Sequence, residues 1–177
     1  MGGQDPAPGW TGRPREEWHP DPDLLEQRLV DDLVARGVNL SEMKWLSLEE
    51  TGSVVQYWMG LGAQRYGRLA LVPADGSNVR RGEFPEGELP IWLCSDPQSR
   101  EVFISFSRPA SGRRKMARST LGFAVDNMAA LARADGDGFA AVTSNLEGVL
   151  LVNVSLDPGS PLEIDAWGDF VRELPEP

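Results

Sequence analysis

The chain has 177 residues, 41% of them hydrophobic, and carries 17 Lys and Arg against 27 Asp and Glu, a formal net charge of −10. This size and composition indicate one packed domain, and the negative charge disfavours binding to nucleic-acid phosphates. No apolar run approaches the roughly 20 residues of a membrane-spanning helix, and the start of the chain lacks the basic and apolar regions of a signal peptide. The single cysteine, Cys94, excludes an internal disulfide and fits a reducing cytoplasm, where we expect the protein to reside.

The first residues have the composition of an unfolded segment. Residues 1–22 hold five prolines and four glycines and follow neither the helical nor the strand period. Such a segment buries too little apolar surface to offset its ordering entropy, so we predict a disordered tail over residues 1–20. Trp10 and Trp18 within it either dock on the surface of the domain or form a linear motif for another protein.

The first predicted helix covers residues 21–37. Asp21 suits the N-cap, Pro22 suits the first helical position and Gly37 ends the pattern. Apolar residues at helical spacing give it one apolar face, for the core or for a partner. These residues are Leu24, Leu25, Leu29, Val30, Leu33 and Val34.

A second helix start lies at Ser47 and Glu50. Their spacing is that of a capping box, in which each side chain bonds the backbone N–H of the other residue. Gly52 weakens the helix by about 1 kcal/mol relative to Ala. A strand over residues 54–59 is the alternative.

The following part of the chain favours β-structure. We predict a strand at "RLALVP" (68–73), a polar loop over residues 74–88, and strands at "LPIWLC" (89–94) and "EVFISFS" (101–107). The short Asp-Pro turn between the last two predicts that they form a hairpin.

The remaining segments alternate between a helix and strands. A helix is predicted over residues 120–136, with Val125, Met128, Leu131 and Ala132 buried. Strands are predicted at 139–144, 148–155 and 161–165, followed by a terminal turn or helix at 167–174. The whole pattern predicts an α+β fold, with a mainly antiparallel sheet and helices packed against it, in a single domain over residues 21–177.

The stretch "SRPASGRRKMARST" (107–120) concentrates positive charge in an acidic protein. It has five basic residues and no acid, and without them the chain would hold 12 basic against 27 acidic residues. We predict a loop that contacts a partner, because such a positive pole orients a charged partner as it approaches. A merely solvated loop and pairing with the acidic C-terminal part are the alternatives. The predicted partner-binding residues are Arg108, Arg113, Arg114, Lys115 and Arg118.

The residues needed for several common chemistries are missing or badly spaced. His19 is the only histidine and lies in the predicted tail, which removes His-based nucleophilic catalysis and His-rich metal sites. The glycines of residues 60–67 lack dinucleotide-loop spacing, and "DGDG" at 135–138 lacks the later acids of a calcium loop. Glu163 and Asp165 alternate onto one strand face and could hold a metal or do acid–base work, but a solvated pair is the commoner outcome. We therefore expect no catalytic residues, no cofactor and no metal.

Residues 68–165 resemble the N-terminal domain of the SseB (enhanced serine sensitivity) family. The resemblance lies in "RLALVPADG", "LPIWLCSDPQSREVFISFSRP", "FAVDNMAALARADGDG" and "VLLVNVSLDPGSPLEI", which follow the order of the family's strand, hairpin, helix and closing strands. It implies an α+β module of no established enzymatic activity. Members are often encoded in actinobacteria, sometimes near specialised secretion or toxin genes, which implies an accessory role.

These observations favour a non-enzymatic protein-binding module, acting as an accessory, chaperone-like or immunity-like factor. Its acidic surface would meet a basic partner, with residues 107–120 as a second contact. The alternative is a small-ligand-binding protein or enzyme with a pocket lined by Trp92, Cys94, Arg114 or Asp165. A nucleic-acid contact through the basic stretch is disfavoured by the net charge.

Overall fold

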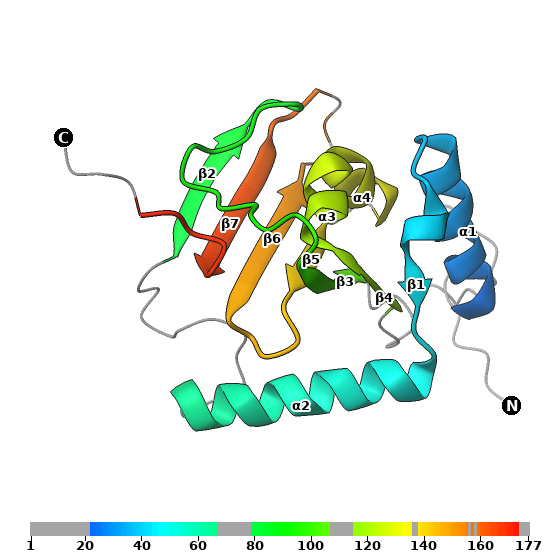
Figure 1. Ribbon diagram of the computed structural model, residues 1–177. Coiled ribbons are helices and arrows are strands. Elements are labelled where there is room, and N and C mark those ends of the chain that lie inside the picture. The colour runs from blue at the N-terminus through cyan, green and yellow to red at the C-terminus, as the bar shows by residue number, and fades with distance from the viewer. Residues whose placement is uncertain are drawn as a thin grey trace, which may run out of the picture.

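The computed structural model describes residues 22–66, 79–106, 115–135, 138–155, 157 and 159–173. It confirms the predicted α+β fold, because a seven-stranded antiparallel sheet has helices packed on both faces (Figure 1). The predicted tail with Trp10 and Trp18, and the predicted strand at 68–73, lie outside the described residues. Within those residues, no helix combines the length and the apolar character that crossing a membrane requires.

The sheet has the strand order β1-β4-β3-β5-β6-β7-β2, so that β1 and β2 are its edges. The helical segments are α1 (Pro22–Ala35), η2 (Leu40–Glu42), α2 (Leu48–Tyr66), α3 (Leu121–Asp126) and α4 (Met128–Asp135). The strands are β1 (Lys44–Trp45), β2 (Arg80–Phe84), β3 (Glu101–Phe106), β4 (Lys115–Thr120), β5 (Phe139–Val142), β6 (Gly148–Val154) and β7 (Leu162–Gly168).

Both predicted N-terminal helices are confirmed. Helix α1 begins at Pro22, as the proline predicts. The capping box starts α2: the Ser47 N–H donates to Glu50 Oε2 over 2.7 Å, and the Glu50 N–H donates to Ser47 Oγ over 3.1 Å. The helix continues for 19 residues, so the alternative of a strand at 54–59 is wrong.

The two faces of the sheet have separate apolar layers. On one face, α1, α3 and α4 cover Val102, Ile104 and Phe106 of β3 and the residues aligned with them on other strands. On the opposite face, hereafter the α2 face, Trp58 of α2 packs against Phe103 with ring centroids 5.8 Å apart. Alternation along the strands therefore assigns each side chain to one of two environments.

Two strand predictions are wrong. Residues 80–84 were expected in a polar loop but form the edge strand β2, which pairs with β7. An edge strand tolerates charges and glycine because one side of it faces solvent. Conversely, "LPIWLC" forms no strand: the chain turns where the Leu93 N–H donates to the Pro90 carbonyl, and Leu93 makes only an isolated bridge to Val171. The predicted hairpin is therefore absent, and β3 pairs with β4 and β5 instead.

The predicted helix over 120–136 is two helices, because α3 ends at Asn127, whose side-chain amide donates to the Phe123 carbonyl. Thr120 caps α3 by accepting from the Phe123 N–H. Of the residues predicted to be buried, Met128, Leu131 and Ala132 are buried, whereas Val125 is half-buried. The segment after β7 is a turn, one of the two predicted alternatives.

Candidate functional site: a protein-interaction face

The α2 face carries exposed charged residues near both edges of the sheet. Leu162 and Ile164 of β7 lie in the core under α1, α3 and α4, so the alternate residues Glu163 and Asp165 point to the α2 face. The prediction that these two acids share a strand face is confirmed. They are joined there by Arg81 and Glu83 of the neighbouring strand β2.

Arg81 and Asp165 form a bidentate pair across β2 and β7. Arg81 Nε donates to Asp165 Oδ1, and Nη2 donates to Oδ2, both over 2.9 Å. Asp165 is buried, with 8% of its surface exposed, whereas 67% of the Arg81 side chain is exposed. The hydrogen bonds and charge of Asp165, and the charge of Glu163, raise the pKa of Arg81 above its ordinary value. Asp165 is therefore already matched within the chain.

Glu83 and Glu163 lie directly opposite each other on β2 and β7. Both are exposed, and among the described residues neither takes part in an ion pair. The neighbouring base, Arg81, is bound to Asp165. Like charges directly opposite on paired strands destabilise a sheet. We call Arg81, Glu83, Glu163 and Asp165 the acidic group; it holds three acids and one base.

A pair of cations occupies the other edge of the same face. Lys44 of β1 and Arg118 of β4 lie opposite each other, and both are exposed. The Arg118 guanidinium carbon lies 5.6 Å from the centroid of the Phe103 ring, which orients the side chain on the α2 face. Neither cation forms an ion pair within the described part of the chain. We call these two residues the cationic pair.

The predicted basic loop is in part a strand, because residues 115–120 are β4. Lys115 Nζ lies 2.5 Å from Glu26 Oε1 and 4.8 Å from the centroid of the Trp45 ring, so its charge is matched inside the chain. Arg118 is the described member of the predicted set that remains exposed without an ion-pair partner. Arg108, Arg113 and Arg114 lie outside the described residues.

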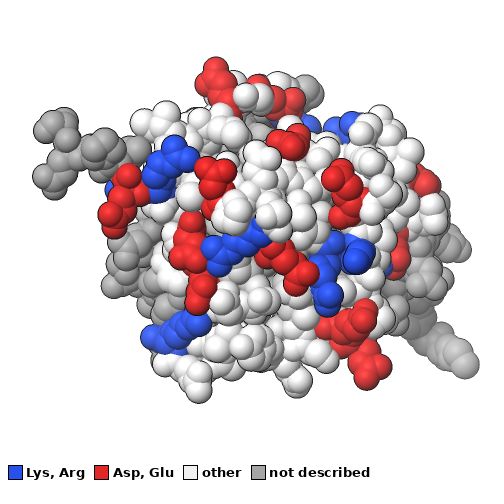
Figure 2. Space-filling view, viewed as in Figure 1, with Lys and Arg blue, Asp and Glu red and all other residues white. Residues whose placement is uncertain are grey.

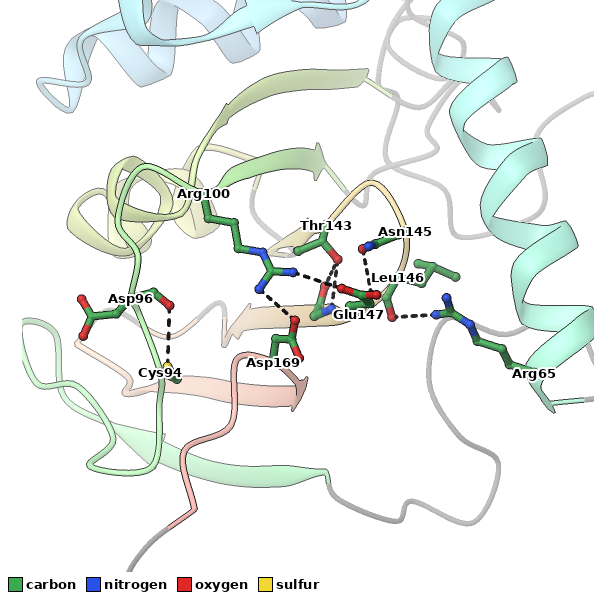
Figure 3. Close-up of polar contacts among 10 residues, drawn as sticks. Arg65, Cys94, Asp96, Arg100, Thr143, Asn145, Leu146, Glu147 and Asp169 are labelled. Carbon is green, nitrogen blue, oxygen red and sulfur yellow. Dashed lines mark hydrogen bonds and ion pairs between the residues drawn. The ribbon is translucent and has the colours of Figure 1, made fainter.

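The residues suggested for a ligand pocket are not brought together. Trp92 packs edge-on against Phe84 in the layer under α1, α3 and α4, whereas Asp165 points to the opposite face. Cys94 is half-buried, with Sγ 3.8 Å from the Asp96 carbonyl oxygen (Figure 3), and Arg114 is outside the described residues. Within the described ranges, no group of three or more His, Cys, Asp or Glu residues is arranged to hold a metal ion.

A second polar cluster is used to hold the fold together. Arg100 points toward both Glu147 and Asp169, at 3.6 and 2.8 Å (Figure 3). On the other side of the same turn, Arg65 Nη1 of α2 donates to the Leu146 carbonyl over 3.3 Å. These bonds fasten the β5–β6 turn to the C-terminal turn and to α2. Because both arginines already bond groups of this chain, the cluster is structural.

Sequence reasoning found Glu163, Asp165 and Arg118 but missed Arg81, Glu83 and Lys44. Arg81 and Asp165 are 84 positions apart in the chain, so their pairing is set by the order of the strands in the sheet. One local signal was available: in "RRGEF", charged Arg81 and Glu83 alternate with Gly82 and Phe84.

Comparison of the chain with protein-family models, with curated proteins and with solved structures finds no significant match. A function therefore has to follow from the charges and contacts of this chain.

Proposed function

We propose that the protein is a non-enzymatic, cytoplasmic binding module that docks a protein partner with a basic surface on the acidic group. The observation that carries this proposal is the direct apposition of exposed Glu83 and Glu163. Cross-strand neighbours contribute roughly 0.2–1 kcal/mol, and like charges oppose folding. A lysine or arginine of a partner placed between the two carboxylates would relieve this repulsion on binding.

The cationic pair supplies the second contact. Lys44 and Arg118 lie near one edge of the α2 face, and Glu83 and Glu163 lie near the other edge. Two groups of opposite sign on one face orient an approaching partner and raise its association rate. Arg118 thereby keeps the role predicted from the sequence, and Lys44 joins it.

By binding this partner, the protein would act as an accessory factor of the chaperone-like or immunity-like kind. The resemblance of residues 68–165 to the SseB family supports this role, because that resemblance implies a module without established catalysis. The net charge of −10 supports a basic partner.

The proposal is tested by affinity purification of the tagged full chain from the organism that encodes it. The double variant Glu83→Gln/Glu163→Gln should lose a partner that the native chain retains at low salt and releases at high salt. The control Glu88→Gln/Asp126→Asn removes the same charge at exposed positions outside the acidic group and should retain the partner. If all three chains recover the same proteins, the acidic group is not the docking site.

A further inference from the structure

Strand β2 is the longer of the two edge strands of the sheet, with five residues against the two of β1. Among the described strands it pairs with β7 alone, whereas each inner strand has two neighbours (Figure 1). The hydrogen bonds among the described residues include none to the backbone of residues 80–84 beyond the β2–β7 ladder. Alternate backbone groups of a strand point to opposite sides, so about half of those of β2 point away from β7, where an added strand would bind.

The two faces of β2 present opposite charges. Glu83 lies opposite Glu163 and points to the α2 face, whereas Arg80 lies opposite buried Ala166 and points to the face of α1, α3 and α4. Arg80 and Glu83 are both exposed, and neither forms an ion pair within the described part of the chain. Figure 2 shows blue and red atoms together on the side of the molecule where β2 lies. This edge therefore carries two unmatched charges of opposite sign, three residues apart.

We propose that β2 binds an extended segment of the partner as an added antiparallel strand, with a base opposite Glu83 and an acid opposite Arg80. In that orientation the base of the partner precedes its acid by three residues. Directly opposed side chains have Cβ atoms about 4.5–5.5 Å apart, and opposite charges there stabilise the pair. Main-chain bonds to the edge supply affinity and the two charge pairs supply specificity. The inference rests on the proposed function, because Glu83 belongs to the acidic group, and it specifies how the partner presents its base.

An apolar residue of the partner suits the position opposite Gly82. The ring of Phe84 lies over this glycine, since a Cβ added at Gly82 would be 2.7 Å from Phe84 Cε2. Phe84 is half-buried and packs edge-on against Trp92, which fixes the ring beside the edge. A β-branched side chain of the added strand would pack on this ring.

A second copy of β2 fits this edge less well than a partner strand. In an antiparallel pair of two β2 strands centred on their middle residues, Glu83 would face Arg81, which Asp165 already binds. Arg80 would face Phe84 and would stay without an acid. Charges on an edge strand hinder pairing with most other strands. The same charges select a strand with the complementary pattern.

Two peptides of the same composition test the charge pattern on the full chain. The matched peptide is acetyl-Thr-Thr-Lys-Val-Thr-Glu-Thr-amide, and the control exchanges its Lys and Glu, so neither has a net charge. In an NMR titration at low salt, the matched peptide should shift the amide signals of residues 80–84 and bind at least about fivefold more tightly than the control.

A pair of variants ties this preference to β2. Glu83→Lys should abolish the preference, whereas Glu101→Lys, which changes an exposed acid of β3 by the same charge, should keep it. Equal affinities of the native chain for the two peptides would overturn the proposal. So would an absence of binding up to millimolar concentration, the result expected if the strand predicted at 68–73 paired with β2 instead.

N-methylation of the matched peptide tests the main-chain pairing. In an added strand, alternate N–H groups face β2 and the others face solvent. Methylation of one alternate set should therefore abolish binding, and methylation of the other set should not. If the two sets have equal effects, strand pairing is wrong, while a remaining preference for the matched peptide would keep the acidic group as the docking site of a base. The two proposals can thus fail separately.

Discussion

At the scale of single residues, some charged side chains on the α2 face pair with other groups of the chain and some do not. Asp165 is buried and accepts three hydrogen bonds from Arg81. On the opposite face, Lys115 forms an ion pair with Glu26 of α1. Glu83 and Glu163, in contrast, face each other, and the base beside them, Arg81, is hydrogen-bonded to Asp165. The residues that remain unmatched are the ones assigned to a partner.

The Arg81–Asp165 pair should contribute modestly to stability. Since most of the Arg81 side chain is exposed, solvent screens the pair, and we expect Asp165→Ala to cost about 1 kcal/mol of unfolding free energy. Asp165→Asn should cost less, because the amide oxygen still accepts one hydrogen bond. Urea denaturation measures both. An Asp165→Ala chain as stable as the native one would show that the pair adds nothing to the fold.

At the scale of secondary structure elements, local signals in the sequence located the helices well. The capping box of Ser47 and Glu50 and the proline at position 22 place two helix starts correctly. The strands were harder. β2 is rich in charge and contains Gly82, so its strand character comes from pairing with β7 at the edge of the sheet. Likewise, β4 has two buried apolar residues, Met116 and Ala117, but they stand between basic residues, so its sequence does not look like that of a strand. The pairing of β2 with β7 has no local signature, because it joins segments that are far apart in the chain.

Trp58 anchors α2 to the sheet. It is 1% exposed, packs edge-on against Phe103 and donates its Nε1–H to the Ser144 carbonyl over 3.2 Å. Trp58→Ala should therefore lower the free energy of unfolding by about 3–5 kcal/mol. Trp58→Phe retains most of the packing but leaves the Ser144 carbonyl without its donor. Its unfolding free energy should therefore lie between those of the native chain and of Trp58→Ala. Thermal and urea unfolding measure the series; a loss below about 1 kcal/mol for Trp58→Ala would mean that α2 is not fixed through this side chain.

Gly52 lowers the stability of α2. Because its Cβ position is open, Gly52→Ala should raise the unfolding free energy by about 1 kcal/mol. Urea unfolding of the two chains measures the difference. A Gly52→Ala chain that is no more stable than the native one would contradict this expectation.

At the scale of the whole molecule, the charged residues of the α2 face occupy particular positions on the sheet. The cationic pair and the acidic group lie near opposite edges of one face, and the uncharged side of α2 runs across it (Figures 1 and 2). Composition alone predicted an acidic protein with a basic partner, and the order of the strands determines which acids adjoin one another. The long-range pairing of β2 with β7 is thus the part of the candidate site that a single sequence does not reveal.

Glu83 and Glu163 lie side by side on β2 and β7, and we expect their repulsion to lower the stability of the fold. A double-mutant cycle of Glu83→Gln, Glu163→Gln and the double variant, measured by urea unfolding at low salt, isolates this repulsion. We expect an unfavourable coupling of roughly 0.2–1 kcal/mol that fades as salt is added. If the coupling were zero or favourable, no repulsion would remain for a basic partner to relieve, and the proposed role of the acidic group would be wrong.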